Sequence, residues 1–118
     1  MDNLMERCED YARICRETTS IPVELFDTYQ VKKGLRDKNG EGVRAGLTNI
    51  SRVDAFEMVD GQKTPCDGKL YYRGISIEDL VGGFTGENRF GFEESAYLLL
   101  FGRLPDKGEL QQFNDTLA

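Results

Sequence analysis

The 118-residue sequence contains no histidine. Histidine is the side chain whose ordinary pKa lies closest to neutral pH, so the chain lacks the commonest general base. Cys66 could act as a nucleophile only beside an activating base, and none is evident. No CxxC pair, glycine-rich phosphate-binding motif or metal-ligand spacing is present. The sequence therefore assigns no catalytic, cofactor-binding or metal-binding residue.

Cysteine is scarce as well, with three residues at positions 8, 15 and 66. Their odd number and wide spacing do not indicate a disulfide framework. Cys8 and Cys15 are seven positions apart in a helical pattern, so we predict that both are small buried apolar groups. The start of the chain is charged, and no stretch approaches 18 apolar residues. We therefore expect a cytoplasmic protein with reduced thiols, no secretion signal and no membrane span.

Positive charge is in the minority, since the formal net charge is −6. An acidic chain disfavours nonspecific binding to nucleic acid or to anionic membrane. Residues 30–52 are an exception, because six cations there outnumber two anions and leave a local charge of +4. A solvated basic loop explains this stretch, and an anion site for a phosphorylated ligand or an acidic partner is the alternative. Four aromatic residues are predicted to lie in the core and not on a base-stacking surface: Tyr71, Tyr72, Phe90 and Phe92.

Residues 1–29 are predicted to be helical. Leu4, Cys8, Tyr11 and either Ile14 or Cys15 recur at steps of three and four, which is the spacing of one apolar helix face. The pattern ends at Thr18-Thr19. Ser20 is then a candidate N-cap and Pro22 a candidate first-turn residue of a second short helix that reaches Tyr29.

Residues 30–74 are predicted to form turns and a small β-hairpin. Residues 37–40 and the dipeptide Asp60-Gly61 are turn signals, and Pro65 and Gly68 are expected to interrupt any strand. Leu70-Tyr71-Tyr72 has strand composition and ends at Gly74. We therefore expect a hairpin whose connection, through residues 62–67, is long and contains a proline.

Residues 75–118 are predicted to be helical again. Ser76, with Asp79 three positions later, indicates the start of a short helix that ends before Gly82-Gly83, and residues 82–91 are expected to be a surface loop. A helix over residues 92–101 carries Phe92, Ala96, Leu99 and Leu100 on one face and has Gly102 as its C-cap.

The last predicted helix begins with a capping pair, Asp106 and Glu109. Leu110, Phe113 and Leu117 follow as its apolar stripe, which continues to the last residues and indicates that the chain goes on beyond Ala118. The predicted fold class is mainly α with a small β-hairpin or sheet.

One order of short segments is distinctive. The segments are Gly46-Leu47-Thr48-Asn49-Ile50, Val59-Asp60-Gly61, Gly68-Lys69-Leu70-Tyr71-Tyr72-Arg73-Gly74, Ile77-Glu78-Asp79-Leu80, Phe92-Glu93-Glu94 with Gly102-Arg103-Leu104-Pro105, and Glu109-Leu110. This order resembles the N-terminal region of the citrate synthase family, including its 2-methylcitrate synthase relatives. The resemblance covers residues 46–118, and residues 62–67 and 82–91 are longer than the common family form.

The resemblance implies an acyltransferase that condenses acetyl-CoA with oxaloacetate to citrate and CoA, the entry step of the tricarboxylic acid cycle, or a 2-methylcitrate synthase. It implies that residues 1–118 form an N-terminal segment of the all-α citrate synthase fold. The expected partners are the rest of the chain, a second subunit in a homodimer, acetyl-CoA and oxaloacetate, with no further cofactor. The segment alone is expected to be inactive and structural. A free-standing dimerisation or anion-binding module is the alternative function.

Overall fold

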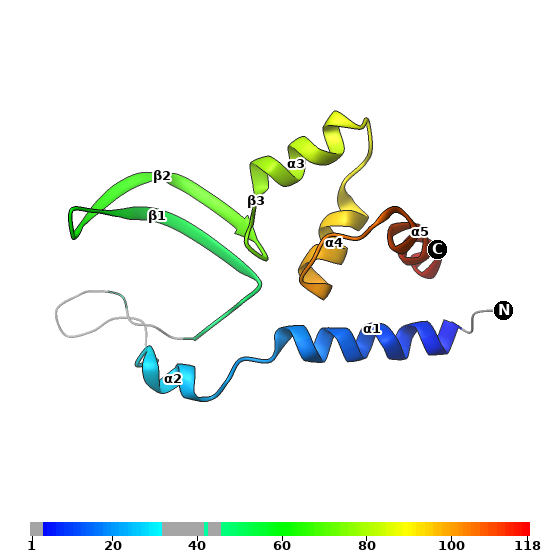
Figure 1. Cartoon of the computed structure of the whole chain (residues 1–118), viewed down its shortest axis with the longest axis horizontal. Coiled ribbons are helices and arrows are strands. Elements are labelled where there is room, and N and C mark those ends of the chain that lie inside the picture. Colours follow the sequence, from blue (N-terminus) through cyan, green and yellow to red (C-terminus); the bar gives the residue numbers. More distant parts are fainter. Residues whose placement is uncertain (1–3, 32–41, 43–45) are drawn as a thin grey trace.

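The computed structural model describes residues 4–31, 42 and 46–118 (Figure 1). The predicted turn at residues 37–40 and most cations of the basic stretch lie outside the described residues. Helices predominate, as the sequence predicts, and three strands form one antiparallel sheet in the order β1-β2-β3. The elements are α1 (Leu4–Thr19), α2 (Glu24–Thr28), β1 (Ser51–Val59), β2 (Gln62–Tyr72), β3 (Ile75–Ser76), α3 (Ile77–Gly86), α4 (Phe92–Phe101) and α5 (Lys107–Leu117).

A small aromatic core lies where α1, α4 and α5 meet (Figure 1). Tyr97 and Phe101 of α4 and Phe113 of α5 are buried, and Tyr11 of α1 packs against them. The ring of Phe113 meets the rings of Tyr97 and Phe101 edge to face, at centroid distances of 5.5 and 5.8 Å. Edge-to-face contact is a favourable geometry for aromatic pairs. The predicted stripes on α1 and α5 therefore meet in one cluster, whereas α4 contributes a face other than the predicted one, and Ile14, Cys15 and Ala96 lie at the border of the cluster.

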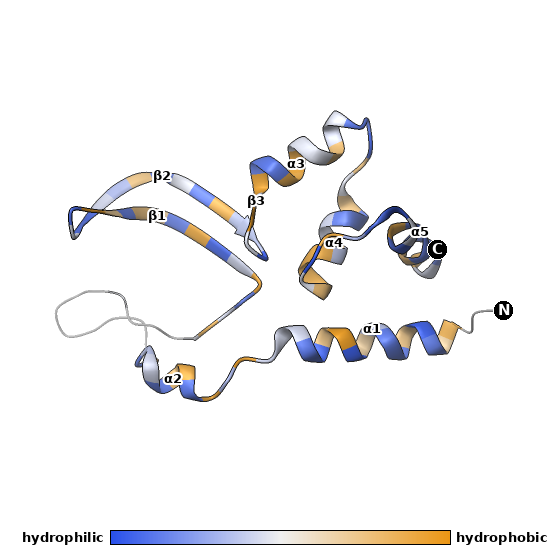
Figure 2. Ribbon diagram, in the orientation of Figure 1, coloured by the Kyte–Doolittle hydropathy of each residue, from blue (hydrophilic) through white to orange (hydrophobic). Residues whose placement is uncertain are grey.

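The burial predicted for several side chains is wrong. Phe90 is 97% and Phe92 76% exposed, and Cys8 is also exposed. The buried face of α4 carries Tyr97, Leu98 and Phe101 in place of the predicted face. The reason is tertiary, because α1 and α5 cover only one side of α4. Other apolar residues of these helices remain exposed, among them Leu4, Leu100 and Leu117. Figure 2 marks the hydrophobic residues along each helix in orange.

The hairpin is longer and more regular than predicted. Asp60 and Gly61, with φ values of 50° and 77°, form the two-residue turn that suits the twist of a hairpin. Residues 62–67, predicted to be a loop, belong to β2. The extra length is accommodated by a register shift: Asp54 pairs with Lys69 but Phe56 pairs with Pro65, so residues 66–68 lie opposite Ala55 alone. Proline and glycine are tolerated in strands at such irregularities.

Two helix boundaries also differ from the prediction. The N-cap of α2 is Val23, so Ser20 and Pro22 lie before the helix. Helix α3 starts at the predicted cap, where Ser76 Oγ accepts a hydrogen bond from the Asp79 amide, but it continues through Gly82-Gly83 to Gly86. Each glycine lowers helix stability by only about 1 kcal/mol, which a capped helix tolerates. The loop is therefore reduced to residues 87–91, where Gly91 lies against the ring of Phe84.

Helices α4 and α5 end and begin as predicted. Gly102, with a φ of 83°, is the left-handed C-cap of α4. Asp106 accepts a hydrogen bond from the Glu109 amide, and the Glu109 carboxylate accepts one from the Asp106 amide, which completes a capping box. None of the helices in the described part of the chain combines the length and apolar character that crossing a bilayer requires.

Candidate functional site

Cys66, the possible nucleophile named in the sequence, and the acidic first turn of α4 belong to different elements of the fold. Cys66 is a half-buried residue of β2, opposite the β1 irregularity. Glu93 and Glu94 both belong to the first turn of α4, where the helix dipole favours anions, and Glu94 forms an ion pair with Arg89. Among the described residues, no group of three or more cysteine, aspartate or glutamate side chains could hold a metal ion.

Arg73 joins three parts of the chain that are distant in sequence. Its Nε and Nη2 atoms donate to the Leu99 carbonyl of α4 at 3.0 and 2.8 Å. Its Nη1 atom donates to the Thr18 carbonyl of α1 at 3.0 Å. The Asn49 amide donates to the same Thr18 carbonyl at 2.9 Å. We call these four residues the Arg73 junction.

The junction neutralises the ends of two helices. Thr18 and Leu99 lie in the last turns of α1 and α4, where carbonyl groups lack helical partners and carry partial negative charge. The next carbonyl, that of Leu100, accepts from Cys15 Sγ at 3.5 Å and from Thr18 Oγ1 at 3.4 Å. A guanidinium fork suits this arrangement because several of its donors have fixed directions. The junction thus holds the hairpin, α1 and α4 together.

Two motif segments singled out in the sequence meet here. Asn49 belongs to the Gly46–Ile50 segment and Arg73 to the strand end that closes at Gly74. The backbone amide of Arg73 also donates to the Ile50 carbonyl at 2.8 Å, which closes the base of the hairpin. The sequence did not predict that Arg73 binds the ends of two helices. Its only local signal is an arginine beside a turn glycine, which does not indicate its partners. The segments that carry the family resemblance therefore build a structural junction.

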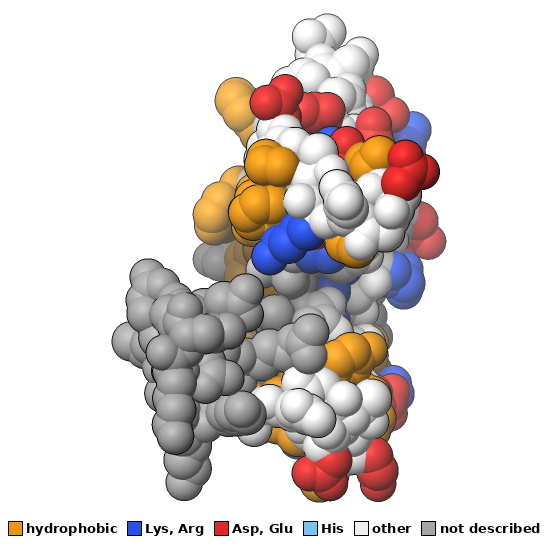
Figure 3. All heavy atoms as spheres, turned by 90° about the vertical axis from the view of Figure 1, so that its left-hand side faces the viewer, with side chains coloured by type: hydrophobic (Ala, Val, Ile, Leu, Met, Phe, Trp, Pro, Cys, Tyr) orange, Lys and Arg blue, Asp and Glu red, His pale blue; other side chains and the backbone are white. Residues whose placement is uncertain are grey.

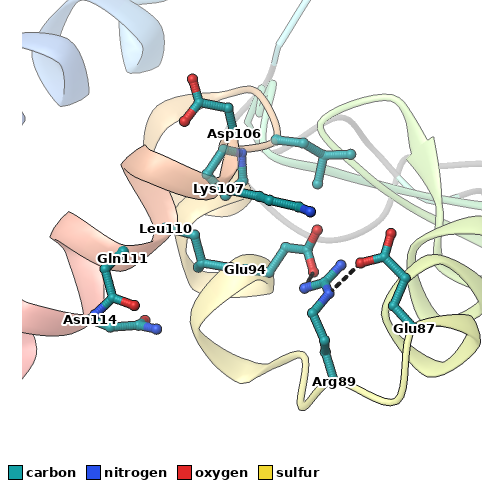
Figure 4. Close-up of a pocket in the computed structure, with 10 residues that line it drawn as sticks. Glu87, Arg89, Glu94, Asp106, Lys107, Leu110, Gln111 and Asn114 are labelled. Atoms are coloured by element: carbon teal, nitrogen blue, oxygen red, sulfur yellow. Dashed lines mark hydrogen bonds and ion pairs between the residues drawn. The ribbon is translucent and has the colours of Figure 1, made fainter.

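A groove separates the α3–α4 connection from α5, and we call it the α4–α5 groove (Figure 4). Two adjacent cavities of about 530 and 620 Å³ share Arg89, Glu94, Leu110 and Asn114 as lining residues. The side chains of Glu87 and Glu94 converge on Arg89, at 2.7 and 2.9 Å (Figure 4). The remaining lining is partly apolar and includes the exposed rings of Phe90 and Phe92.

The charge of Arg89 is fixed by this pairing. Hydrogen bonds from the guanidinium to Glu94 and Glu87 raise the Arg89 pKa above its already high ordinary value. Glu94 is the better protected partner, with a side chain that is 13% exposed. The groove therefore presents the Arg89 guanidinium and its two carboxylate partners beside apolar surface.

A second ion pair joins the connection after α4 to the first turn of α5. The guanidinium of Arg103 binds both carboxylate oxygens of Glu109, with Nη1 2.7 Å from Oε2. Two contacts lower the Glu109 pKa from 4.5 to about 2. The hydrogen bonds from Arg103 have the larger effect, and the hydrogen bond from the Asp106 amide adds to it. Arg103 also lies 5.9 Å from the centre of the Tyr97 ring. Glu109 thus connects the capping box of α5 to the aromatic core.

Acid should weaken the ion pair between Arg103 and Glu109. Because the folded-state pKa of Glu109 is depressed, its stabilising contribution is present above about pH 4.5 and is lost as the pH falls toward 2. Between pH 4.5 and 2, we expect the Tm of Glu109→Gln, measured by circular dichroism, to fall less than the Tm of the parent protein. Glu78→Gln, at an exposed carboxylate in the first turn of α3, is the matched control. Equal pH dependence of the Glu109→Gln and parent proteins would contradict the assignment.

Comparison with known proteins gives concordant matches. Residues 34–118 match the family model described as "Citrate synthase, C-terminal domain". The citrate synthase of Saccharolobus solfataricus is 42% identical over 76 residues, which are 64% of this chain and 18% of that protein. 2-Methylcitrate synthase 1 of Corynebacterium glutamicum is 41% identical over 87 residues, covering 74% of this chain and 17% of that protein. The citrate synthase of Thermoplasma acidophilum is 34% identical over 91 residues, which are 77% of this chain and 18% of that protein.

The chain thus spans less than a fifth of the length of these curated relatives. No solved structure gives a significant match. The matching family model is described by a C-terminal domain, whereas the resemblance in the sequence indicated the N-terminal end of the family, so the place of these residues within a longer enzyme stays a prediction. The family itself is settled by a match over most of the chain: this protein belongs to the citrate synthase family.

Proposed function

We propose that this chain is the N-terminal, structural part of an acyltransferase that condenses acetyl-CoA with oxaloacetate to give citrate and CoA. The family match over residues 34–118 supports the reaction, and the order of the sequence segments supports the N-terminal place. The sequence contributes no histidine, so the reactive groups would come from polypeptide outside these 118 residues. The contribution of this chain is to hold α1, α4 and the hairpin in fixed relation through the Arg73 junction. We further propose a cytoplasmic location and a homodimeric enzyme.

A chimaera tests this function. The matched 76 residues of the Saccharolobus solfataricus citrate synthase would be replaced by the corresponding residues of this chain, and CoA release would be followed with a thiol reagent. We expect the 118-residue chain alone to show no turnover and the chimaera to form citrate. A chimaera carrying Arg73→Ala should lose activity in parallel with its thermal stability. Turnover by the isolated chain, or a folded chimaera with no activity, would contradict the proposal.

A 2-methylcitrate synthase is the second candidate, favoured by the 41% identity to such an enzyme. 2-Methylcitrate carries one methyl group more than citrate, so its acyl donor would be propionyl-CoA in place of acetyl-CoA. Assaying both donors, with the full-length enzyme that contains this chain, distinguishes the two functions. A higher kcat/KM for propionyl-CoA would favour the second candidate.

A further inference from the structure

We draw no further inference here: the strongest candidate, the exposed apolar surface of the β1–β2 hairpin around Val53, Phe56 and Met58, at the end of the molecule that faces the viewer in Figure 3, carries none because nothing in the structure shows what covers it.

Discussion

Phe113→Ala should lower the free energy of unfolding by about 3–5 kcal/mol, the usual cost of removing a buried aromatic ring. The Phe113 side chain is 4% exposed and contacts the rings of Tyr11, Tyr97 and Phe101, with centroid distances from 5.5 to 6.0 Å. Phe113 is the one buried residue of α5, so its removal takes away the main contact of this helix with the core. Urea denaturation followed by circular dichroism measures the change.

Phe90→Ala is the matched control for this change. The same atoms are removed, but from a ring that is 97% exposed, so the free energy of unfolding should move by less than about 0.5 kcal/mol. Phe113→Leu keeps most of the apolar volume and should fall between the two, which provides a measurable protein if the alanine variant does not fold. Similar losses for Phe113→Ala and Phe90→Ala would show that the aromatic cluster is not the core.

Arg73→Ala should cost about 3 kcal/mol, since bonds from a charged donor are each worth more than neutral ones and the change leaves two helix-end carbonyls without this donor. The carbonyls concerned are those of Thr18 and Leu99. Arg73→Lys should recover only part of the loss, because one ammonium group cannot reproduce the fork that reaches both helices. Urea denaturation again gives the free energy, and loss of the ordered α1–α4 contact should appear as faster amide exchange in α1.

Arg52→Ala is the control for Arg73. Arg52 forms an exposed ion pair with Asp54 and lies 4.2 Å from the centre of the Tyr71 ring, contacts that together contribute about 1 kcal/mol or less. If Arg73→Ala were no more costly than Arg52→Ala, the junction would be incidental to the stability of the chain.

Features decided by neighbouring residues were predictable from the sequence. The caps at Ser76, Gly102 and Asp106 depend on a few adjacent backbone and side-chain groups, and all three are confirmed. The family resemblance was also confirmed, because it rests on short segments in a fixed order. Local chemistry thus predicted these three helix ends and the family.

Features decided by distant packing were not predictable. Helical periodicity shows that Phe92 and Tyr97 belong to different faces of α4, but only the position of α1 and α5 determines that Tyr97 is the buried one. Residues 62–67 contain a proline and were interpreted as a loop, yet pairing with β1 draws them into a strand. The Arg73 junction joins residues up to 55 positions apart, and no pattern in one sequence reveals such a contact.

The register shift in the hairpin has a consequence for how its length can change. Three residues of β2 lie opposite one residue of β1, an excess of two. Since side chains alternate with a period of two, an even excess leaves the distal half of the ribbon with the same orientation as the proximal half. An odd insertion or deletion at positions 66–68 would rotate Lys63 and Pro65 to the reverse side. Viable length variants of this hairpin should therefore differ by even numbers of residues.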